Sequence, residues 1–407
     1  MITINADLHI HSKYSKATSN LMDIENIVIS AKEKGITLLS TGDFTHPLWL
    51  KEIKEKLDFE NGIGKYKNVY FILGCEVSNV FEKNKKTYKV HNLIFSESIE
   101  EVLQINEAFS KYGNLKEDGR PTLNCSVEEM VEILKSISKN IGIVPAHIWT
   151  PWFSLFGSNF GCDDIKEIFS DTSMLIALET GLSSDPLMNW MVSKIDKYTL
   201  ISNSDAHSLY NIGREANKLK VKELSYKEII EGIKNGEAIL KTYEFFPQEG
   251  KYYNDGHRKC NVSMSYEDAE KINNICPVCK KKLTKGVMHR IKTLSDREYG
   301  EKRPNFKPFQ HIIQLKHVIA KLKNKKPESK EVNDIYRKII LHFGNELAVY
   351  EASDKDLYVY LDKEIAEAII KIKNDKIRWK PGYDGVYGEF ILNGNEQKTL
   401  KRWYDEV

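Results

Sequence analysis

Two histidines near the start of the chain have the spacing of a metal-binding pair. The segment Ala6-Asp7-Leu8-His9-Ile10-His11-Ser12 follows a short apolar run, residues 2–4, that predicts the start of a buried strand. Because side chains on a strand alternate between faces, we expect His9 and His11 to point the same way, with Asp7 beneath them. Two such imidazoles can chelate one metal ion. Taken alone, the pair fits two chance surface histidines equally well.

Other histidines and carboxylates follow strands elsewhere in the chain, and they favour the metal-binding interpretation. Asp205-Ala206-His207 repeats the alternation of His9 and His11, so two separate strands each offer a chelating pair. Ligands that mix imidazole with carboxylate favour zinc or manganese over an all-oxygen magnesium site. Any single member of this set could be a core or loop residue without a ligand role, but that explanation fits the whole set poorly. The set is His9, His11, Asp43, His46, Glu76, His91, His147, Asp205 and His207.

Short apolar strands alternate with amphipathic helices from residue 4 to about residue 245, and this alternation must position the polar residues. Capping boxes at Ser126 and Ser225 predict the starts of two of the helices. A repeated strand–helix pattern of this length predicts a parallel sheet, closed as a barrel or doubly wound. The carboxyl ends of such strands meet at one rim, where barrel enzymes assemble their active sites. The first predicted strand is entered at residues 2–4, and the others are 37–41, 69–73, 88–95, 142–144, 175–178 and 198–201.

Chain length, composition and net charge limit the number of domains and the kinds of partner that the protein can have. At 407 residues the chain is long enough for two or three domains, and 41% apolar residues suffice for real cores. The net charge of +2 means that nucleic-acid affinity would have to come from local basic patches. We find no apolar run near 18 residues and no signal-peptide pattern, and therefore expect a cytoplasmic protein without membrane contact. Binding to DNA would make it nucleoid-associated.

A second cluster of metal-binding residues lies past residue 245, where the strand–helix rhythm ends. His257-Arg258-Lys259-Cys260 and Cys276-Pro277-Val278-Cys279 are two pairs with two-residue gaps, 15 residues apart. This spacing fits a tetrahedral structural zinc site, whereas reduced core cysteines are a poor explanation in so polar a stretch. Its basic flank, which includes Lys285, suits contact with a phosphate backbone or is a solvated face.

The remainder of the chain is predicted to be helical. Apolar residues recur at helical spacing from Ile312 to Leu322, from Val332 to Ile340 and from Ile365 to Ile372. The stretch Pro381-Gly382-Tyr383-Asp384-Gly385-Val386-Tyr387-Gly388 could bring backbone amides close to a nucleic acid, or it could be a β-turn before a strand. We therefore expect a barrel over residues 1–245, a zinc-binding module over 246–295, and a helical domain with a glycine-rich hairpin, suited to DNA binding, over 296–407.

The motifs Asp7-Leu8-His9-Ile10-His11-Ser12 and Asp205-Ala206-His207 resemble those of the PHP (polymerase and histidinol phosphatase) phosphoesterases. The resemblance implies a seven-stranded, distorted TIM-like barrel with two or three divalent metals: zinc, manganese or magnesium. By analogy, His9, His11, Glu76 and Asp205 hold one metal, while Glu76, His91 and His147 hold a second. Asp43, His46 and His207 would hold the third, although many members have the aspartate and histidine of that motif adjacent. Asp205 and His207 would be catalytic, with Asp205 orienting the attacking hydroxide.

A narrower resemblance, to the endonuclease Q family, covers essentially the whole chain. It is carried by Thr41–Leu50, Pro145–Trp152, Asn203–Ser208, Gly213–Asn217 and Pro381–Gly388, and by the order of barrel, zinc cluster and helical tail. Here His257 takes the place of one cysteine that family members often have. The resemblance implies DNA repair by cleavage 5′ of deaminated bases (uracil, hypoxanthine, xanthine) or abasic sites, with the lesion turned out of the helix. Sliding-clamp contact is a further expectation. Candidate substrate contacts are Trp149, Trp152, Phe153, Phe156, Arg214, Lys285 and Tyr383. The four aromatic side chains could stack on the lesion base, or they could form a lid or a hydrophobic plug.

Three functions compete on the sequence alone. A metal-dependent, lesion-directed DNA endonuclease explains both the ligand set and the appendages. A PHP phosphatase for a small phosphomonoester explains the ligands but needs neither the zinc cluster nor the helical tail. A non-catalytic nucleic-acid-binding subunit would have no use for so complete a ligand set. The tail could also bind a protein partner.

Overall fold

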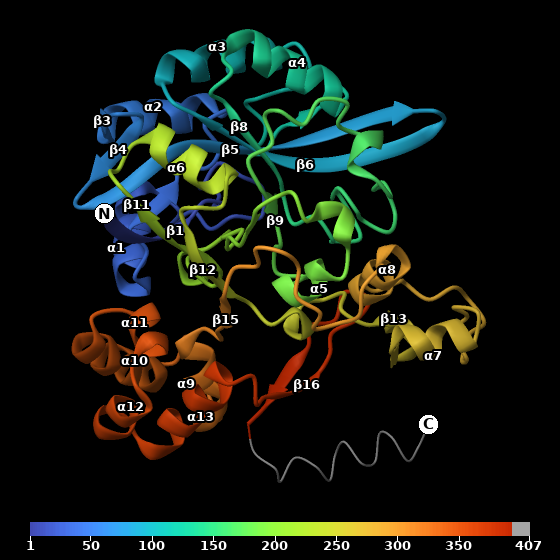
Figure 1. The fold of residues 1–407 in the computed structure, drawn as a ribbon. Helices are drawn as coiled ribbons and strands as arrows, with labels where there is room; N and C mark the ends of the chain where they lie inside the picture. Colours follow the sequence, from blue (N-terminus) through green and yellow to red (C-terminus); the bar gives the residue numbers. More distant parts are fainter. Residues whose placement is uncertain (393–407) are drawn as a thin grey trace.

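The computed structural model describes residues 1–392, in which strands with covering helices are followed by two smaller regions (Figure 1). One of these carries α7, α8 and β13, and the other is the group of helices α9 to α13. The end of the third predicted domain, residues 393–407, lies outside the described part of the chain. None of the helices described is both long enough and apolar enough to cross a bilayer.

All seven predicted strands are present, with shifted ends. Each pairs with a neighbour, and polar residues follow most of them. β1 pairs in parallel with β2, and β2 in parallel with β5. The seven strands are β1 (Ile2–Asp7), β2 (Leu38–Ser40), β5 (Val69–Lys83), β6 (Lys86–Ser96), β8 (Gly142–Pro145), β9 (Leu178–Glu179) and β10 (Leu200–Ile201).

The prediction of an all-parallel sheet is wrong for one of these strands, β6. β6 runs antiparallel to both β5 and β8, so β5 and β6 form a long hairpin that projects from the sheet (Figure 1). Asn84 and Lys85 form its turn, both at positive φ (54° and 62°), which matches the right-handed twist of the strands. A connection of two residues is too short for a helix, and Asn at the first of these positions is typical of a tight turn.

The sheet is larger and less regular than a seven-stranded barrel. Eleven strands form one mixed sheet, and β9 and β10 form a separate parallel pair. The segments next to this pair connect to the main sheet through two single bridges. Leu175, before β9, pairs with Ile143, and Ala206, after β10, pairs with Ile10. The strand pairing in the described residues therefore does not form a regular closed barrel. The other strands of the large sheet are β3 (Asp58–Glu60), β4 (Ile63–Tyr66), β7 (Thr122–Leu123), β11 (Ala216–Val221), β12 (Ile239–Glu244) and β15 (Phe309–His311).

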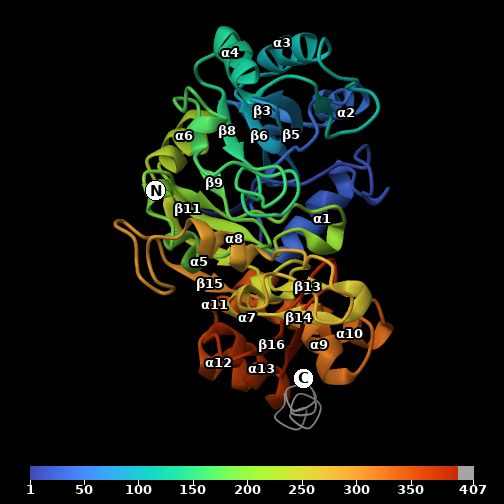
Figure 2. The ribbon, with the colours of Figure 1, turned by 90° about the vertical axis from the view of Figure 1, so that its right-hand side faces the viewer.

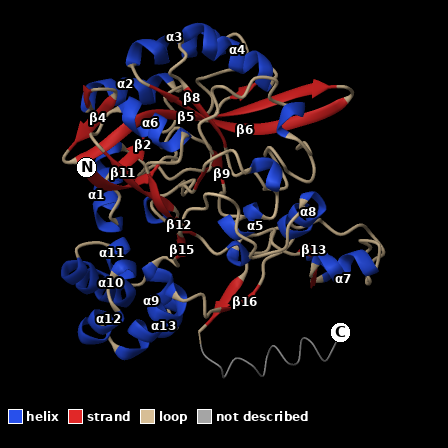
Figure 3. Ribbon diagram, viewed as in Figure 1, coloured by secondary structure: helices blue, strands red, loops and turns tan. Residues whose placement is uncertain are grey.

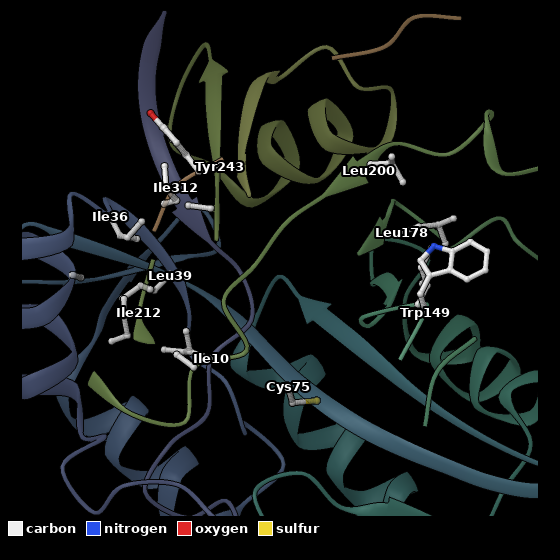
Figure 4. Close-up of a cluster of buried hydrophobic side chains, with 14 of the residues drawn as sticks. Ile10, Ile36, Leu39, Cys75, Trp149, Leu178, Leu200, Ile212, Tyr243 and Ile312 are labelled. Carbon is white, nitrogen blue, oxygen red and sulfur yellow. The ribbon is translucent and has the colours of Figure 1, made fainter. Parts of the chain in front are cut away.

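Amphipathic helices cover this sheet (Figure 3). The apolar side chains between the helices and the sheet form two clusters of buried residues. The predicted capping box at Ser126 is present, with Ser126 and Glu129 each accepting from the other's backbone amide. Ile10, Leu39 and Cys75 lie together in the core beneath the polar rim (Figure 4). The covering helices are α1 (Ile24–Lys34), α2 (Pro47–Lys56), α3 (Ile99–Phe109), α4 (Val127–Ile137), α5 (Pro186–Trp190) and α6 (Tyr226–Lys234).

The C-terminal regions lie against one side of the sheet (Figure 2). β15 falls within the third predicted domain, yet it pairs in parallel with β12 and so extends the main sheet. The cysteine-bearing region consists of β13 (Asp255–His257), β14 (Val262–Met264), α7 (Tyr266–Lys271) and α8 (Val287–Leu294). The tail consists of α9 (Leu315–Lys323), α10 (Lys330–Phe343), α11 (Glu346–Glu351), α12 (Asp354–Tyr360), α13 (Lys363–Lys373), β16 (Arg378–Lys380) and β17 (Glu389–Ile391).

Candidate metal centre

The first and last motifs of the sequence lie side by side beyond β1 and β10. The amide of His11 donates to the Ala206 carbonyl at 2.9 Å, and Ile10 and Ala206 form a parallel bridge. Because Ile10 and Ala206 both point into the core, the residues on either side of each point to the opposite face. His9, His11 and Asp205 thereby converge: Asp205 Oδ1 lies 3.5 Å from His9 Nε2 and 3.2 Å from His11 Nε2.

Glu76 on β5 lies between two groups of potential ligands. Its Oε2 faces His11 Nε2 at 3.1 Å and His9 Nε2 at 3.4 Å. Its Oε1 faces His91 Nδ1 at 2.6 Å and His147 Nε2 at 3.1 Å. The ligand atoms of His9, His11, Glu76 and Asp205 lie within 4.8 Å of one another, as do those of Glu76, His91 and His147. One carboxylate thus offers one oxygen to each group, which is the geometry of a bridging ligand.

Two further carboxylates fix the orientation of the imidazoles. His9 Nδ1 lies 3.1 Å from both oxygens of Glu179, and His11 Nδ1 lies 3.0 Å from Asp43 Oδ1. A carboxylate on Nδ1 leaves Nε2 unprotonated and able to bind a metal. Glu179 also accepts from the His147 amide at 2.8 Å and from Asn203 Nδ2 at 2.8 Å. Glu179 therefore supports both groups.

The buried polar atoms of this centre fit a cation. His9 Nε2, His11 Nε2 and Asp205 Oδ1 are buried without a hydrogen-bond partner in the described residues. Buried polar atoms normally have partners, and three that face one point are explained by an ion among them. Burial lowers the pKa of His91 to about 4, so its ring is neutral and suited to metal binding. Burial opposes ionisation of Glu76, but His91 and Arg120 lower its pKa well below the usual value.

Strained backbone occurs at this rim. Asp43, His147 and Asp205 are non-glycine residues with φ of 47°, 32° and 47°. Such conformations cost roughly 1–3 kcal/mol each and cluster at functional sites. At Gly181, a Cβ would lie 2.5 Å from the Cβ of His147, so glycine is needed for the close approach of the two strand ends.

The residues expected to hold a third metal have other partners. Asp43 bonds to His11 and accepts from the Ser12 amide, the Ser12 hydroxyl and the Ser15 hydroxyl. His46 Nε2 lies 3.3 Å from the Lys116 carbonyl, and its ring stacks on Tyr14. His207 lies with its ring 4.4 Å from that of His11. Within residues 1–392, Asp43, His46 and His207 do not form a ligand group of their own, so the third metal stays a prediction.

Two residues that the sequence did not single out complete the centre. Glu179 directly follows the predicted strand 175–178. This position could have identified it, since the residues that follow the other predicted strands supply ligands. Arg120 Nη1 lies 3.3 Å from Glu76 Oε2, and it comes from the loop between α3 and β7, where no pattern indicated a site.

The cysteine-bearing region brings its four predicted ligands together. The ligand atoms of His257, Cys260, Cys276 and Cys279 lie within 4.8 Å of one another. Burial raises the pKa of Cys276, but the backbone amides of Cys279 and Val278 outweigh this and lower it to about 6, which favours the metal-binding thiolate. All six cysteines lie within residues 1–392, and none of them forms a disulfide there.

The predicted substrate contacts divide by exposure. Trp152 is 43% exposed and Phe153 is half-buried, so both can be reached from solvent, as can the exposed Lys285. Trp149 and Phe156 are core residues that pack on each other, and the Trp149 indole donates to Asn189. Their rings are therefore covered, which fits the alternative of a hydrophobic plug and not stacking on a base.

Two other predicted contacts are already engaged. Arg214 donates to the carbonyls of Ser204 at 2.8 Å and Asp205 at 3.3 Å, so it holds the backbone of the last motif. Tyr383 is buried and donates to Asn261 in the cysteine-bearing region. Its neighbours form a β-turn, with the Val386 amide donating to the Tyr383 carbonyl, before β17. The turn interpretation of the glycine-rich stretch is confirmed, and Tyr383 is not free to bind a substrate.

Comparison with known proteins gives matches over the full chain. A protein of Bacillus subtilis (strain 168), described as "Uncharacterized protein YqxK", is 30% identical over 96% of this chain and 99% of its own length. The family model "MJ0043 C-terminal domain" matches residues 314–376, which begin at the residue before α9.

Two solved structures match over nearly their whole length. The lesion-specific endonuclease PfuEndoQ of Pyrococcus furiosus is 32% identical, with a TM-score of 0.87, over 98% of this chain and 97% of its own. A structure of endonuclease Q in complex with a 27-mer duplex that carries an abasic lesion is 32% identical, with a TM-score of 0.86, over 97% and 98%. At this identity and coverage, the chain belongs to the endonuclease Q family.

Proposed function

We propose that this protein is a metal-dependent DNA repair endonuclease that hydrolyses the phosphodiester on the 5′ side of a damaged base. The observation that carries the proposal is the placement of Glu76, with one oxygen toward each of two ligand groups. Divalent cations held there would activate water for attack and neutralise charge on the phosphate. No nucleophilic serine or cysteine is required.

Each residue of the centre has a distinct task in this proposal. His9, His11 and Asp205 hold one cation, His91 and His147 hold the other, and Glu76 belongs to both. Glu179 and Asp43 orient the imidazoles through Nδ1. Asp205 has a further role as the group that orients the attacking water. In support, 26% of its side chain is exposed, whereas the side chains of His9, His11 and Glu76 are at most 1% exposed. His207, equally exposed and 3.4 Å from Asp205 Oδ1, would assist proton transfer.

The lesions expected are deaminated bases (uracil, hypoxanthine, xanthine) and abasic sites. For the family relative with a duplex, the lesion is an abasic site. Trp152 and Phe153 support contact with an unstacked base, since they are accessible and the Phe153 ring lies 5.0 Å from the ring of His91. A damaged or missing base is the easiest to turn out of the duplex.

The cysteine cluster is proposed to hold one structural zinc and to place the basic flank, including Lys285, on the DNA backbone. Its local core consists only of Ala269, Cys276 and Leu283 with a few partly buried neighbours, too little to order it without a bound ion. The three-domain division at residues 245 and 295, the sliding-clamp contact and the nucleoid location stay predictions.

The experiment is a nicking assay with Mn²⁺ or Zn²⁺ and duplexes that contain one deoxyuridine, one deoxyinosine or one abasic site. An undamaged duplex and p-nitrophenyl phosphate serve as the controls. We expect one nick, on the 5′ side of the lesion, that disappears with a chelator. Turnover of p-nitrophenyl phosphate alone would favour the phosphatase alternative, and no turnover of either would favour a binding subunit.

A further inference from the structure

Arg120 places a cationic side chain beside the carboxylate shared by the two ligand groups. Its Nη1 lies 3.3 Å from Glu76 Oε2, and its side chain is 26% exposed, whereas that of Glu76 is fully buried. The guanidinium therefore lies beside the carboxylate that both ligand groups share, and it is partly open to solvent.

The loop that carries Arg120 is tied to the elements that carry the ligands. The Gly119 amide donates to the Tyr14 carbonyl at 3.0 Å, and Thr45 Oγ1 donates to the Gly119 carbonyl at 3.0 Å. On the other side, the Ser78 amide of β5 donates to the Pro121 carbonyl at 3.0 Å. A Cβ at Gly119 would lie 2.4 Å from Asp43 Oδ2, so the loop backbone packs directly against the carboxylate that orients His11. A side chain on such a loop is held in place before a substrate arrives.

Most hydrogen-bonding capacity of Arg120 is unused. A guanidinium has five N–H donors, and in residues 1–392 that of Arg120 has only the contact with Glu76. Arg214, the other guanidinium near the centre, has its contacts on the carbonyls of Ser204 and Asp205. Because 26% of the Arg120 side chain is exposed, its remaining donors are accessible to a phosphate that approaches the ligand groups from solvent.

We propose that Arg120 binds the non-bridging oxygens of the phosphate that is cut, an inference that rests on the proposed nuclease function. When cations neutralise Glu76, the guanidinium loses much of its electrostatic attraction to that carboxylate. A phosphate oxygen is then the group of opposite charge within its reach, and the planar fork matches phosphate geometry. The phosphate gains charge at these oxygens during attack, so the contact strengthens in the transition state.

A purely structural role makes the opposite prediction for metal binding. If Arg120 served only to orient Glu76, its loss would weaken metal affinity together with activity. If it binds phosphate, its loss removes a positive charge beside the cations, so metal affinity stays equal or becomes tighter. The sign of the change in Mn²⁺ affinity therefore separates the two roles.

The test uses the full-length protein with Arg120→Met and Arg120→Lys, and with Lys227→Met as a control that removes one exposed positive charge on α6. Three quantities are measured: the dissociation constant of Mn²⁺ without DNA, that of inorganic phosphate with Mn²⁺ present, and kcat for nicking at an abasic site. For Arg120→Met we expect a fall in kcat of about 10²–10³-fold, as for loss of one transition-state donor. We also expect phosphate to bind at least about tenfold more weakly, with Mn²⁺ binding no weaker than in the wild type.

Arg120→Lys keeps the charge but not the fork, and should fall between the wild type and Arg120→Met, while Lys227→Met should match the wild type. Unchanged phosphate binding in Arg120→Met, or Mn²⁺ and phosphate binding that weaken in parallel, would overturn the proposal. A wild type that binds phosphate through Arg120 but nicks no DNA would instead refute the proposed function and leave this inference standing.

Discussion

The two candidate metal sites of this protein are built in opposite ways. The ligands at the rim of the sheet come from residues 9 to 205 of the chain, are mostly buried, and are oriented by Glu179 and Asp43. The ligands of the cysteine cluster come from residues 257 to 279, and three of the four are partly exposed. The rim has the cores of the sheet beneath it, whereas the cluster has a core of three buried residues.

In the proposed function, this difference gives the metal a different task in each place. At the rim the sheet would present the ligands without help from the ion and leave room for a substrate. In the cluster the proposed zinc would supply the cohesion that apolar burial does not, so its binding and local folding would be one event. Removal of metal should therefore end chemistry at the first site and order at the second.

The largest effect is expected from Asp205→Asn. It removes the charge that holds one cation and orients the water, a loss of several kcal/mol of transition-state stabilisation, or at least about 10³-fold in rate. DNA affinity and thermal stability should change little, because the other ligands and the sheet stay in place. Single-turnover nicking and fluorescence anisotropy with a labelled duplex measure the two quantities. A variant with the wild-type rate would refute the role of Asp205.

The next largest effect is expected from Cys276→Ser, and it should be local. Loss of one thiolate removes much of a zinc affinity that reaches roughly 10–16 kcal/mol in zinc-dependent folds. Hydrogen exchange by mass spectrometry should show lost protection in residues 255–285 and none in β1 or β2, with weaker DNA binding. Cys125→Ser is the matched control, since Cys125 is buried away from the cluster. If zinc content were the same in both variants, the cluster would not be a zinc site.

A third buried group of a histidine and carboxylates offers a contrast to the two candidate metal sites, because it is held together without a metal. His311 lies between two carboxylates, with Nδ1 2.8 Å from Asp375 Oδ1 and Nε2 3.3 Å from Asp185 Oδ2. Burial alone would lower the pKa of His311, but Asp185 and Asp375 outweigh it and raise the pKa to about 9. A proton, and not a metal, then joins the two carboxylates across the sheet and the tail.

Because this folded-state pKa lies above the ordinary value, the ion pairs stabilise the fold fully below about pH 6.5 and lose that effect as pH rises through about 9. His311→Gln should reduce the free energy of unfolding by at most about 3 kcal/mol at pH 6, from the shift of the pKa, and by much less at pH 10. Urea unfolding at the two pH values measures this, with the exposed His342→Gln as control. A pH-independent loss, or sensitivity to a chelator, would contradict it.

The smallest effect is expected from Glu179→Gln, because Glu179 is not a proposed metal ligand and acts on the rim site by orienting His9. Loss of this charge should reduce metal affinity or activity by about 10–100-fold, as for other groups that orient metal-bound imidazoles. Titration with Mn²⁺ followed by nicking assays measures both. Glu231→Gln, an exposed change on α6, should have no effect. Equal behaviour of the two variants would mean that His9 needs no orienting partner.

Much of this arrangement could be predicted, because alternation along strands is a local rule. The spacing of His9 with His11 and of Asp205 with His207 predicted pairs on one face, and the strands that carry them lie where apolar runs predicted them. The antiparallel β5–β6 hairpin was missed because a two-residue turn leaves a weak pattern, although Asn84 was a signal.

What could not be predicted depends on contacts between distant segments. Nothing in the sequence near Trp149 distinguishes a buried indole bonded to Asn189 from an exposed one. Arg120 reaches the centre only because its loop is tied to Tyr14 and Ser78, far away in the chain. The third metal was expected from the resemblance to the PHP phosphoesterases, whereas the bonds of Asp43 to His11 and Ser12 give that carboxylate an orienting task.

The most direct test is anomalous diffraction from crystals of this protein grown with Mn²⁺. We predict two manganese peaks at the rim, one among His9, His11 and Asp205 and the other between His91 and His147, with one Glu76 oxygen on each. In Glu76→Gln crystals at least one of the two peaks should be lost. A wild-type structure in which Glu76 contacts a single ion or none, with manganese bound elsewhere, would contradict the account.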